Sequence, residues 1–198
     1  MPGKQLFIGI TGGIGSGKTT VCKIFEVLGA KTYYADERAK ALMESDQELI
    51  SEIKSMFGDE AYSDGKLDRK YIAKRAFNDQ SLLERLNNLV HPAVGRDVSV
   101  WKKQQSDSPF LLKEAALLFE TGSYKLLDKN ILITAPEDLR IKRVIKRDSH
   151  RTESDIKAII QKQMSDDDKI PLADFVIDNG EDSSLIKQVM KVHQSIIA

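Results

Sequence analysis

The sequence predicts an α/β fold in which a five-stranded parallel sheet is the middle of three layers, with helices on both faces. Short apolar runs that suit buried strands alternate with stretches of helical periodicity along all 198 residues. The first such run, residues 5–10, leads directly into a glycine-rich loop and then an amphipathic helix. Because this length suits one domain, we assign residues 1–198 to a single domain.

The glycine-rich loop fits the phosphate-binding pattern G-x-x-x-x-G-K-[ST] from Gly12 to Thr19. Glycines let the backbone turn its N–H groups inward around phosphate oxygens, and Lys18 can reach the outer phosphates. The Thr19 hydroxyl would bind Mg²⁺, and the helix that follows points its positive end at the same anion. The residues expected to bind a nucleoside triphosphate here are Gly13, Ile14, Gly15, Ser16, Gly17, Lys18, Thr19 and Thr20.

Residues 13–18 also begin the dinucleotide-binding pattern G-x-G-x-x-G, and Asp36 follows at a suitable distance. The third glycine of that pattern is missing. Lys18 stands in its place, where a long side chain would obstruct close packing of helix against strand. The helix after the loop ends at Gly29 and has its apolar face at Val21, Ile24, Phe25 and Leu28. We therefore favour the phosphate-binding loop.

A β-rich run at residues 31–35 predicts the second strand, which ends at Asp36. Residues just past the carboxyl ends of parallel strands line the ligand crevice, so Asp36 should face the bound phosphates. The same aspartate can cap the helix that begins at Glu37. The two roles are compatible.

Residues 37–105 are helical in pattern and contain no convincing buried strand. Ser45 and Ser81 open capping-box patterns, and residues 63–65 are typical of a turn. This stretch predicts a helical insert between the second and third strands.

Pro92 is expected to end a helix of the insert, because a proline forces the preceding residue, His91, out of helical geometry. A histidine in that place can cap a helix, pack in the core or act on a substrate. Arg69, near a helix start, is a solvated charge unless it meets a substrate phosphate.

Residues 109–114 predict the third strand, whose apolar residues place it at the centre of the sheet. This strand closes on Glu114. In nucleotide kinases an acid at this edge of the sheet holds the water shell of Mg²⁺, and a plain surface glutamate is the alternative. A second apolar run, residues 115–120, ends in Glu120 and predicts a short loop and helix near the phosphate acceptor.

The fourth strand, residues 130–135, precedes a helix that is opened by Pro136. Opposite its apolar stripe this helix carries a basic face that includes Arg140, Arg143 and Arg147. The planar guanidinium suits bidentate contact with phosphates. A mobile lid at this place would bring positive charge over a triphosphate, and a solvated surface is the alternative.

The chain closes with a helix capped by Thr152, a fifth strand at residues 175–178 and a last helix. The last helix is expected to pack Ile186, Val189, Met190 and Ile197 against the sheet. The single domain therefore divides into three parts, which are a core (5–36, 106–139 and 173–198), an acceptor-binding insert (37–105) and a lid region (140–172).

The composition limits the classes of function. Thirty basic and thirty acidic residues cancel, so no global charge draws the chain to nucleic acid or to an anionic membrane. The single cysteine, Cys22, indicates a reducing compartment and a packed thiol. The N-terminus enters the first strand almost at once, which predicts neither a signal peptide nor a membrane span and hence a cytoplasmic protein.

With these motifs in place, the chain resembles the dephospho-coenzyme A kinase family, which has a P-loop kinase fold. The glycine loop is shared by many kinases, whereas its combination with the other segments is specific, and the resemblance spans nearly the whole chain. The segments that carry it are residues 11–20, 35–36, 64–69, 90–92, 117–120, 147–148 and 173–179.

The resemblance implies transfer of the γ-phosphate of ATP to the ribose 3′-hydroxyl of dephospho-coenzyme A, the last step of coenzyme A biosynthesis, with Mg²⁺ as cofactor. It implies that Asp36 orients or deprotonates this hydroxyl, with Lys18 and Arg143 as further catalytic residues. The lid would contribute Arg140, Arg143 and Arg147 to ATP binding. The acceptor would be bound by Asp36, Arg69, His91, Leu117 and Glu120.

Two residues depart from the family pattern, because Ala116 stands where proline is common and Arg140 where a glutamine aligns. They leave open how rigid the acceptor loop is and what Arg140 contacts. Another nucleoside or nucleotide kinase with the same core is an alternative function. A GTPase-type switch is disfavoured, because no Asn-Lys-x-Asp segment follows the fourth strand.

Overall fold

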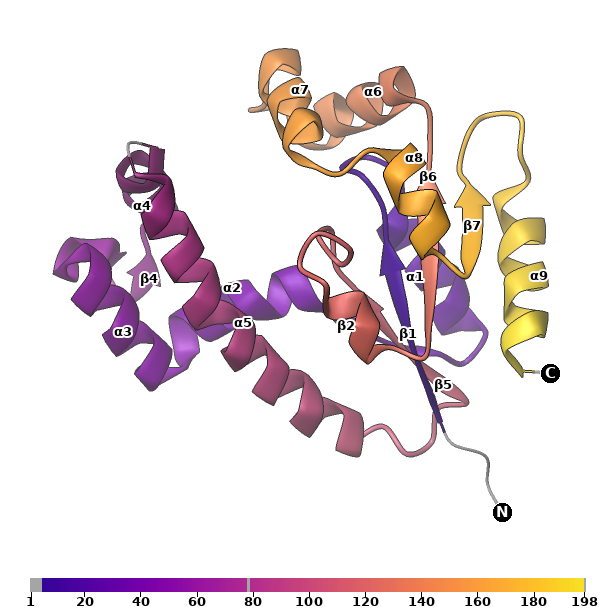
Figure 1. Cartoon of the computed structure of the whole chain (residues 1–198), viewed down its shortest axis with the longest axis horizontal. Coiled ribbons are helices and arrows are strands. Elements are labelled where there is room, and N and C mark those ends of the chain that lie inside the picture. Colours follow the sequence, from indigo (N-terminus) through magenta and orange to yellow (C-terminus); the bar gives the residue numbers. More distant parts are fainter. Residues whose placement is uncertain (1–4, 78, 198) are drawn as a thin grey trace. The chain divides into compact units, whose positions relative to one another are not determined.

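The computed structural model describes residues 5–77 and 79–197 (Figure 1). The chain forms two compact units, and each is described by itself. Unit 1 comprises Met1–Tyr34 and Gln105–Ala198, and unit 2 comprises Ala35–Gln104. Within the described residues, no helix has both the length and the apolar composition needed to cross a bilayer.

Unit 1 is built on the predicted parallel sheet of five strands, in the order β2-β5-β1-β6-β7. The central strand is β1, which pairs with β5 through Leu6 opposite Phe110 and with β6 through Ile8 opposite Lys129. Residues 109–114 were predicted at the centre of the sheet, but the strand they form, β5, lies next to the central strand. The strands are β1 (Leu6–Thr11), β2 (Lys31–Tyr34), β5 (Phe110–Glu114), β6 (Lys129–Thr134) and β7 (Phe175–Asp178).

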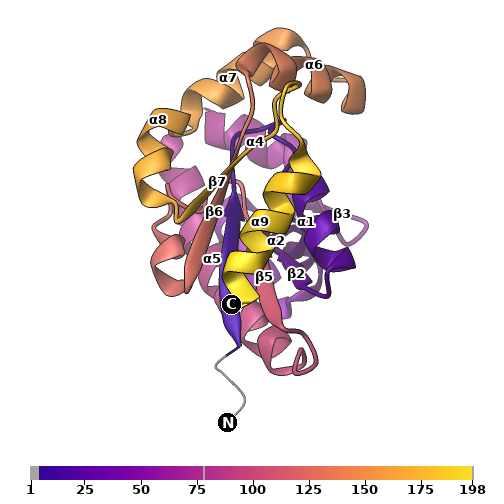
Figure 2. The ribbon, with the colours of Figure 1, turned by 90° about the vertical axis from the view of Figure 1, so that its right-hand side faces the viewer.

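One face of this sheet is covered by α1 (Lys18–Val27) and α9 (Leu185–Ile197), which lie side by side (Figure 2). Ile8 and Ile10 point into this layer, where they share a fully buried core with Phe25. Gly9 points to the opposite face, where a Cβ would collide with Leu118. The remaining helices of unit 1 are α6 (Glu137–Arg147), α7 (Glu153–Lys162), α8 (Asp166–Lys169) and the 3₁₀ turns Ser123–Leu126 and Ile170–Leu172.

The inward face of α9 differs from the predicted one. Val189 is buried as expected, but Ile186 and Ile197 are 64% and 57% exposed. The helix instead packs the stripe Leu185, Val189, Val192 and Ile196 against the core. Both stripes have helical spacing and share Val189, so spacing alone does not decide between them.

Unit 2 is helical, with a short hairpin of β3 (Tyr62–Ser63) and β4 (Lys66–Leu67) at the predicted turn. Its own core is centred on Leu49, Ile53 and Phe57. The other elements are α2 (Ala35–Ser45), α3 (Gln47–Phe57), α4 (Arg69–Phe77), α5 (Gln80–Lys103) and the 3₁₀ turn Asp59–Ala61.

Pro92 does not end a helix, because α5 continues through it to Lys103. A proline removes only one backbone donor. The backbone hydrogen bonds on either side of Pro92 keep α5 helical. The predicted caps were also displaced, since Asp46 rather than Ser45 caps α3 and Asp79 caps α5. Aspartate and serine are about equally good caps, so local preference does not decide which of two neighbours takes the position.

Candidate active site

The predicted phosphate loop connects β1 to α1 and is tightly curled, with Ser16 N donating to Gly13 O at 3.1 Å. At Gly15 the backbone has φ of +78°, in the left-handed region that favours glycine. A Cβ at Gly15 would also lie 2.5 Å from the backbone oxygen of Arg140. The first turn of α6 therefore packs directly on the loop, which accounts for a glycine at this position.

Lys18, at the start of α1, and Glu114, at the end of β5, meet beside the loop. The Lys18 Nζ donates to Gly12 O at 3.0 Å and lies 3.9 Å from Glu114 Oε1. Both side chains are about nine-tenths buried, at 11% and 9% exposure. Thr19 and Thr20 follow in the first turn of α1 with exposed side chains. The loop thus places one cation, one carboxylate and two hydroxyls at the same end of the sheet.

Arg140 lies on α6 with its guanidinium against Gly13, and only 9% of the residue is exposed. Among the described residues its Nε has no hydrogen-bond partner, and no carboxylate pairs with the guanidinium. An unpaired cation is costly to bury. The group would be compensated by an anion bound at the loop.

The other two lid arginines differ in their surroundings. Arg143 donates from NH2 to Asn179 O at 3.0 Å, and its buried NH1 has no partner among the described residues. Arg147 is exposed and donates to Asp148 from both Nε and NH2, at 3.0 and 2.9 Å. These bonds raise the pKa of Arg147 and lower that of Asp148. Arg147 is therefore held by Asp148, whereas Arg143 has a donor left for a ligand.

Two residues that were not assigned to the site contact the loop directly. Gln163, at the end of α7, accepts a hydrogen bond from Ile14 N at 2.9 Å. Asn179, after β7, donates from Nδ2 to Ser16 O at 2.8 Å. Asn179 belongs to a segment that carries the family resemblance, so a signal for it existed. For Gln163, helical spacing predicts only that the residue lies on the same face as the apolar residues of its helix, and it does not predict a contact with the loop.

Glu120 accepts from the backbone of Met164 at 3.1 Å and pairs with the fully buried Lys169 at 3.1 Å. Its second oxygen, Oε2, is buried and has no partner among the described residues. The loop after β5 is thereby joined to the segment that follows α7. Leu117 in the same loop is 45% exposed.

The remaining predicted residues belong to unit 2. Asp36 lies in the first turn of α2, Arg69 begins α4 and His91 lies inside α5. All three are exposed. Arg69 is 3.8 Å from Glu44, an ion pair too exposed to hold the side chain firmly.

The donors that the sequence predicts for a magnesium ion are oxygens, which suits this hard cation. Magnesium keeps several waters and binds through one or two protein groups and the phosphates of its substrate, so Glu114 and the Thr19 hydroxyl fit its needs. Residues 5–77 and 79–197 contain no cluster of three or more histidine, cysteine or acidic side chains suited to a metal.

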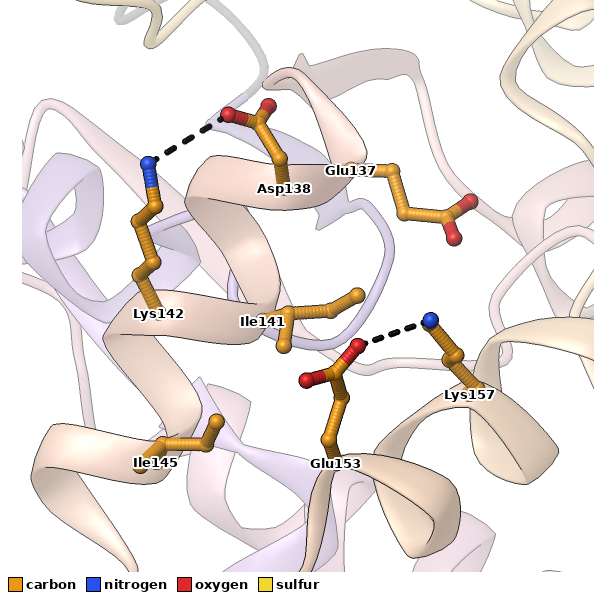
Figure 3. Close-up of a pocket in the computed structure, with 7 residues that line it drawn as sticks. All are labelled: Glu137, Asp138, Ile141, Lys142, Ile145, Glu153 and Lys157. Carbon is orange, nitrogen blue, oxygen red and sulfur yellow. Dashed lines mark ion pairs between the residues drawn. The ribbon is translucent and has the colours of Figure 1, made fainter.

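A pocket of about 430 Å³ opens between α6 and α7 (Figure 3). Each wall carries an ion pair within one helix. Lys142 pairs with Asp138 on α6 at 3.6 Å, and Lys157 pairs with Glu153 on α7 at 2.7 Å. None of the predicted site residues lines this pocket, and these charged groups are already paired. We assign it no catalytic role.

Comparison with known proteins identifies relatives over nearly the full length. The family model for dephospho-CoA kinase matches residues 6–184. The dephospho-CoA kinase of Salinibacter ruber is 40% identical over 175 residues, 87% of each chain. A crystal structure from Thermus thermophilus superposes with a TM-score of 0.86 at 30% identity, covering 98% of both chains. The dephospho-CoA kinase of Campylobacter jejuni gives 0.68 at 28% identity, covering 96% of both.

Proposed function

This chain belongs to the dephospho-CoA kinase family, and from that premise we propose how its own residues carry the reaction. The reaction is the ATP-dependent phosphorylation of dephospho-CoA, which makes the chain a transferase of coenzyme A biosynthesis. The match over residues 6–184 carries this conclusion, because it includes the insert as well as the glycine loop. Kinases with other acceptors and GTPase-type switches are accordingly not favoured.

We propose that the loop and the lid region bind ATP. The backbone N–H groups of residues 13–20 would cradle the phosphates, and Lys18 would extend from its two glycine carbonyls to the outer phosphate. Arg140 supports this assignment, because its buried guanidinium has no anion partner among the described residues. Arg143 and Arg147 would add charge at the transferring phosphoryl group.

Residues 37–105 would bind dephospho-CoA, and residues 140–172 would form the lid. Asp36 would orient or deprotonate the ribose 3′-hydroxyl, aided by contacts from Arg69, His91, Leu117 and Glu120. Phosphoryl transfer to an alcohol passes through a loose transition state, so in-line positioning contributes more than a strong base. Asp36 therefore acts mainly by orienting the acceptor oxygen.

Mg²⁺, when bound with ATP, neutralises negative charge on the phosphate oxygens. Thr19 would offer its hydroxyl to the ion, and Glu114 would act through a water. The ion pair of Glu114 with Lys18 keeps the carboxylate directed toward the loop. A cytoplasmic location remains part of the proposal, from the lone cysteine, which is buried and reduced.

The test is to give the purified protein ATP and Mg²⁺ with dephospho-CoA, AMP or a nucleoside in parallel. We expect coenzyme A to form from dephospho-CoA at a rate at least a hundredfold above phosphorylation of the other acceptors, since a site built to pair polar groups rejects analogues that lack them. Faster phosphorylation of AMP or of a nucleoside would assign the chain to another acceptor.

A further inference from the structure

Asn179 contacts three segments that the predicted nucleotide site brings together. Its backbone N donates to Thr134 O at the end of β6, at 2.8 Å. Its side-chain Nδ2 donates to Ser16 O in the phosphate loop, also at 2.8 Å. Its backbone O accepts from Arg143 NH2 of the lid helix at 3.0 Å. One residue thereby ties strand, loop and arginine together.

The contact with Ser16 fixes the direction of a neighbouring N–H group. In a trans peptide the carbonyl oxygen and the N–H of the next residue point in opposite directions, and the described residues contain no cis peptide bond. When Asn179 holds the Ser16 carbonyl on its side, the Gly17 N–H must point to the other side of the loop. That side is the one a phosphate oxygen would approach in an inward-facing nest of N–H groups.

The contact between Asn179 and Ser16 requires a glycine at position 17. Its backbone has φ of +96°, and a Cβ there would collide with Nδ2 of Asn179. The carboxamide therefore occupies the space that a side chain at this position would fill. Any larger residue would push Asn179 away and release the Ser16 carbonyl.

Arg143 is oriented by the same residue. Its NH2 is used by the Asn179 carbonyl, while its buried NH1 has no partner among the described residues. A buried donor of this kind is satisfied by a ligand acceptor. Asn179 thus fixes the direction of the Gly17 N–H in the loop and the orientation of the Arg143 guanidinium on the lid helix.

The position of Asn179 is itself well fixed. The preceding residue, Asp178, receives a hydrogen bond at its carbonyl from Gln188 Nε2 and donates from its N to Gln188 Oε1, at 2.7 and 2.9 Å. Gln188 lies on α9, which packs on the sheet core. The turn is therefore anchored to the rigid part of unit 1, as a positioning residue requires.

We propose that Asn179 is a positioning residue for ATP, which acts through the Gly17 N–H and through Arg143 and does not touch the acceptor. This inference rests on the proposed function. It requires a carboxamide, because an aspartate of the same shape would set an oxygen against the Ser16 carbonyl. Two acceptors at hydrogen-bond distance repel, so Asn179→Asp should do more damage than truncation to alanine.

The experiment measures the dissociation constant for ATP by calorimetry and the KM values for ATP and dephospho-CoA in the wild type, Asn179→Asp and Asn179→Ala. We expect affinity for ATP to fall about thirtyfold in Asn179→Asp and about fivefold in Asn179→Ala, as expected for a repelled and a lost hydrogen bond. KM for dephospho-CoA should stay within about twofold of the wild type, because neither contact reaches the acceptor. Gln194→Glu, the same change of a carboxamide to a carboxylate at an exposed position of α9, is the matched control and should alter neither value.

A wild type that makes no coenzyme A refutes the proposed function, whereas the inference fails on the variants of an active enzyme. Unchanged ATP affinity in Asn179→Asp would overturn it, as would equal losses for ATP and dephospho-CoA. Thermal unfolding checks that each variant is folded. If Asn179→Asp does not fold, Asn179→Ala decides, and normal ATP affinity in that variant refutes the inference.

Discussion

The phosphate loop of unit 1 and the proposed acceptor residues of unit 2 differ in how their groups are held in place. Around the loop, residues far apart in sequence are joined by specific bonds, such as Ser16 to Asn179 and Ile14 to Gln163. In unit 2 the predicted acceptor residues Asp36, Arg69 and His91 are exposed on three helices above a separate core. The proposed nucleotide site is thus shaped by contacts to the loop backbone, while the proposed acceptor residues of unit 2 are side chains on a surface. Changes around the loop should therefore weaken ATP binding or turnover, whereas changes at the exposed residues of unit 2 should leave ATP binding unaltered.

The strongest test of this difference is Lys18→Ala, with an expected loss in kcat/KM of roughly a thousandfold, or about 4 kcal/mol of transition-state stabilisation. The loss follows from removing a buried cation that the loop carbonyls hold at the proposed phosphate site. Steady-state kinetics with both substrates measures it. Lys23→Ala, an exposed lysine on the same helix, is the control. Near-normal turnover in Lys18→Ala would contradict the assignment of the loop.

Lys169→Met tests whether unit 1 depends on buried contacts away from the loop. Removing one partner of a buried ion pair leaves Glu120 uncompensated, so the free energy of unfolding should fall by about 3 kcal/mol in urea titrations. The double variant Glu120→Leu with Lys169→Met should recover part of this loss, because no unpaired charge is left behind. A single variant that loses less than about 1 kcal/mol would show that the pair is dispensable.

Asp36→Asn tests a proposed acceptor residue of unit 2. We expect kcat to fall about a hundredfold, the low end for a group that orients and accepts a proton, while the dissociation constant for ATP stays within twofold. Stopped-assay kinetics and calorimetry measure the two quantities. Glu37→Gln, the exposed neighbour, serves as control. Equal losses in turnover and ATP affinity would instead place Asp36 in the proposed nucleotide site.

The smallest effect is expected for Arg69→Ala, which should raise KM for dephospho-CoA about tenfold, the worth of one charge-assisted hydrogen bond, and leave KM for ATP unchanged. The exposed guanidinium lies 3.8 Å from Glu44 and is proposed to meet an anionic acceptor. Lys70→Ala removes a neighbouring exposed charge and should change neither constant. A rise in KM for ATP would remove the distinction between the proposed nucleotide site and the acceptor residues of unit 2.

The sequence predicted the parts of the fold that have local signatures. The glycine spacing and apolar runs located the loop and all five strands of the sheet, and Thr152 caps α7 in a capping box with Asp155 as its partner. Local rules failed where two choices were locally equal. Two apolar stripes compete on α9, and Asp46 competes with Ser45 for one cap.

Long-range pairing explains most of what the sequence did not reveal. The bond from Asn179 to Ser16 joins residues separated by 163 positions, and no local pattern encodes it. Lys169 directly follows three acidic residues in the sequence, yet it is fully buried and pairs with Glu120. Such contacts depend on which loops the sheet order brings together, and that order is a property of the whole chain.

The central place of β1 has a consequence for synthesis. This strand leaves the ribosome well before its neighbours in the sheet, which begin at Phe110 and Lys129. At roughly 5–20 residues per second, the nascent chain waits on the order of ten seconds before either neighbour exists. During that interval an apolar strand has both edges open to other chains, the condition that favours aggregation. Translation arrested before residue 110 should therefore yield chains that bind a holdase chaperone, and release of that chaperone should follow the emergence of β6.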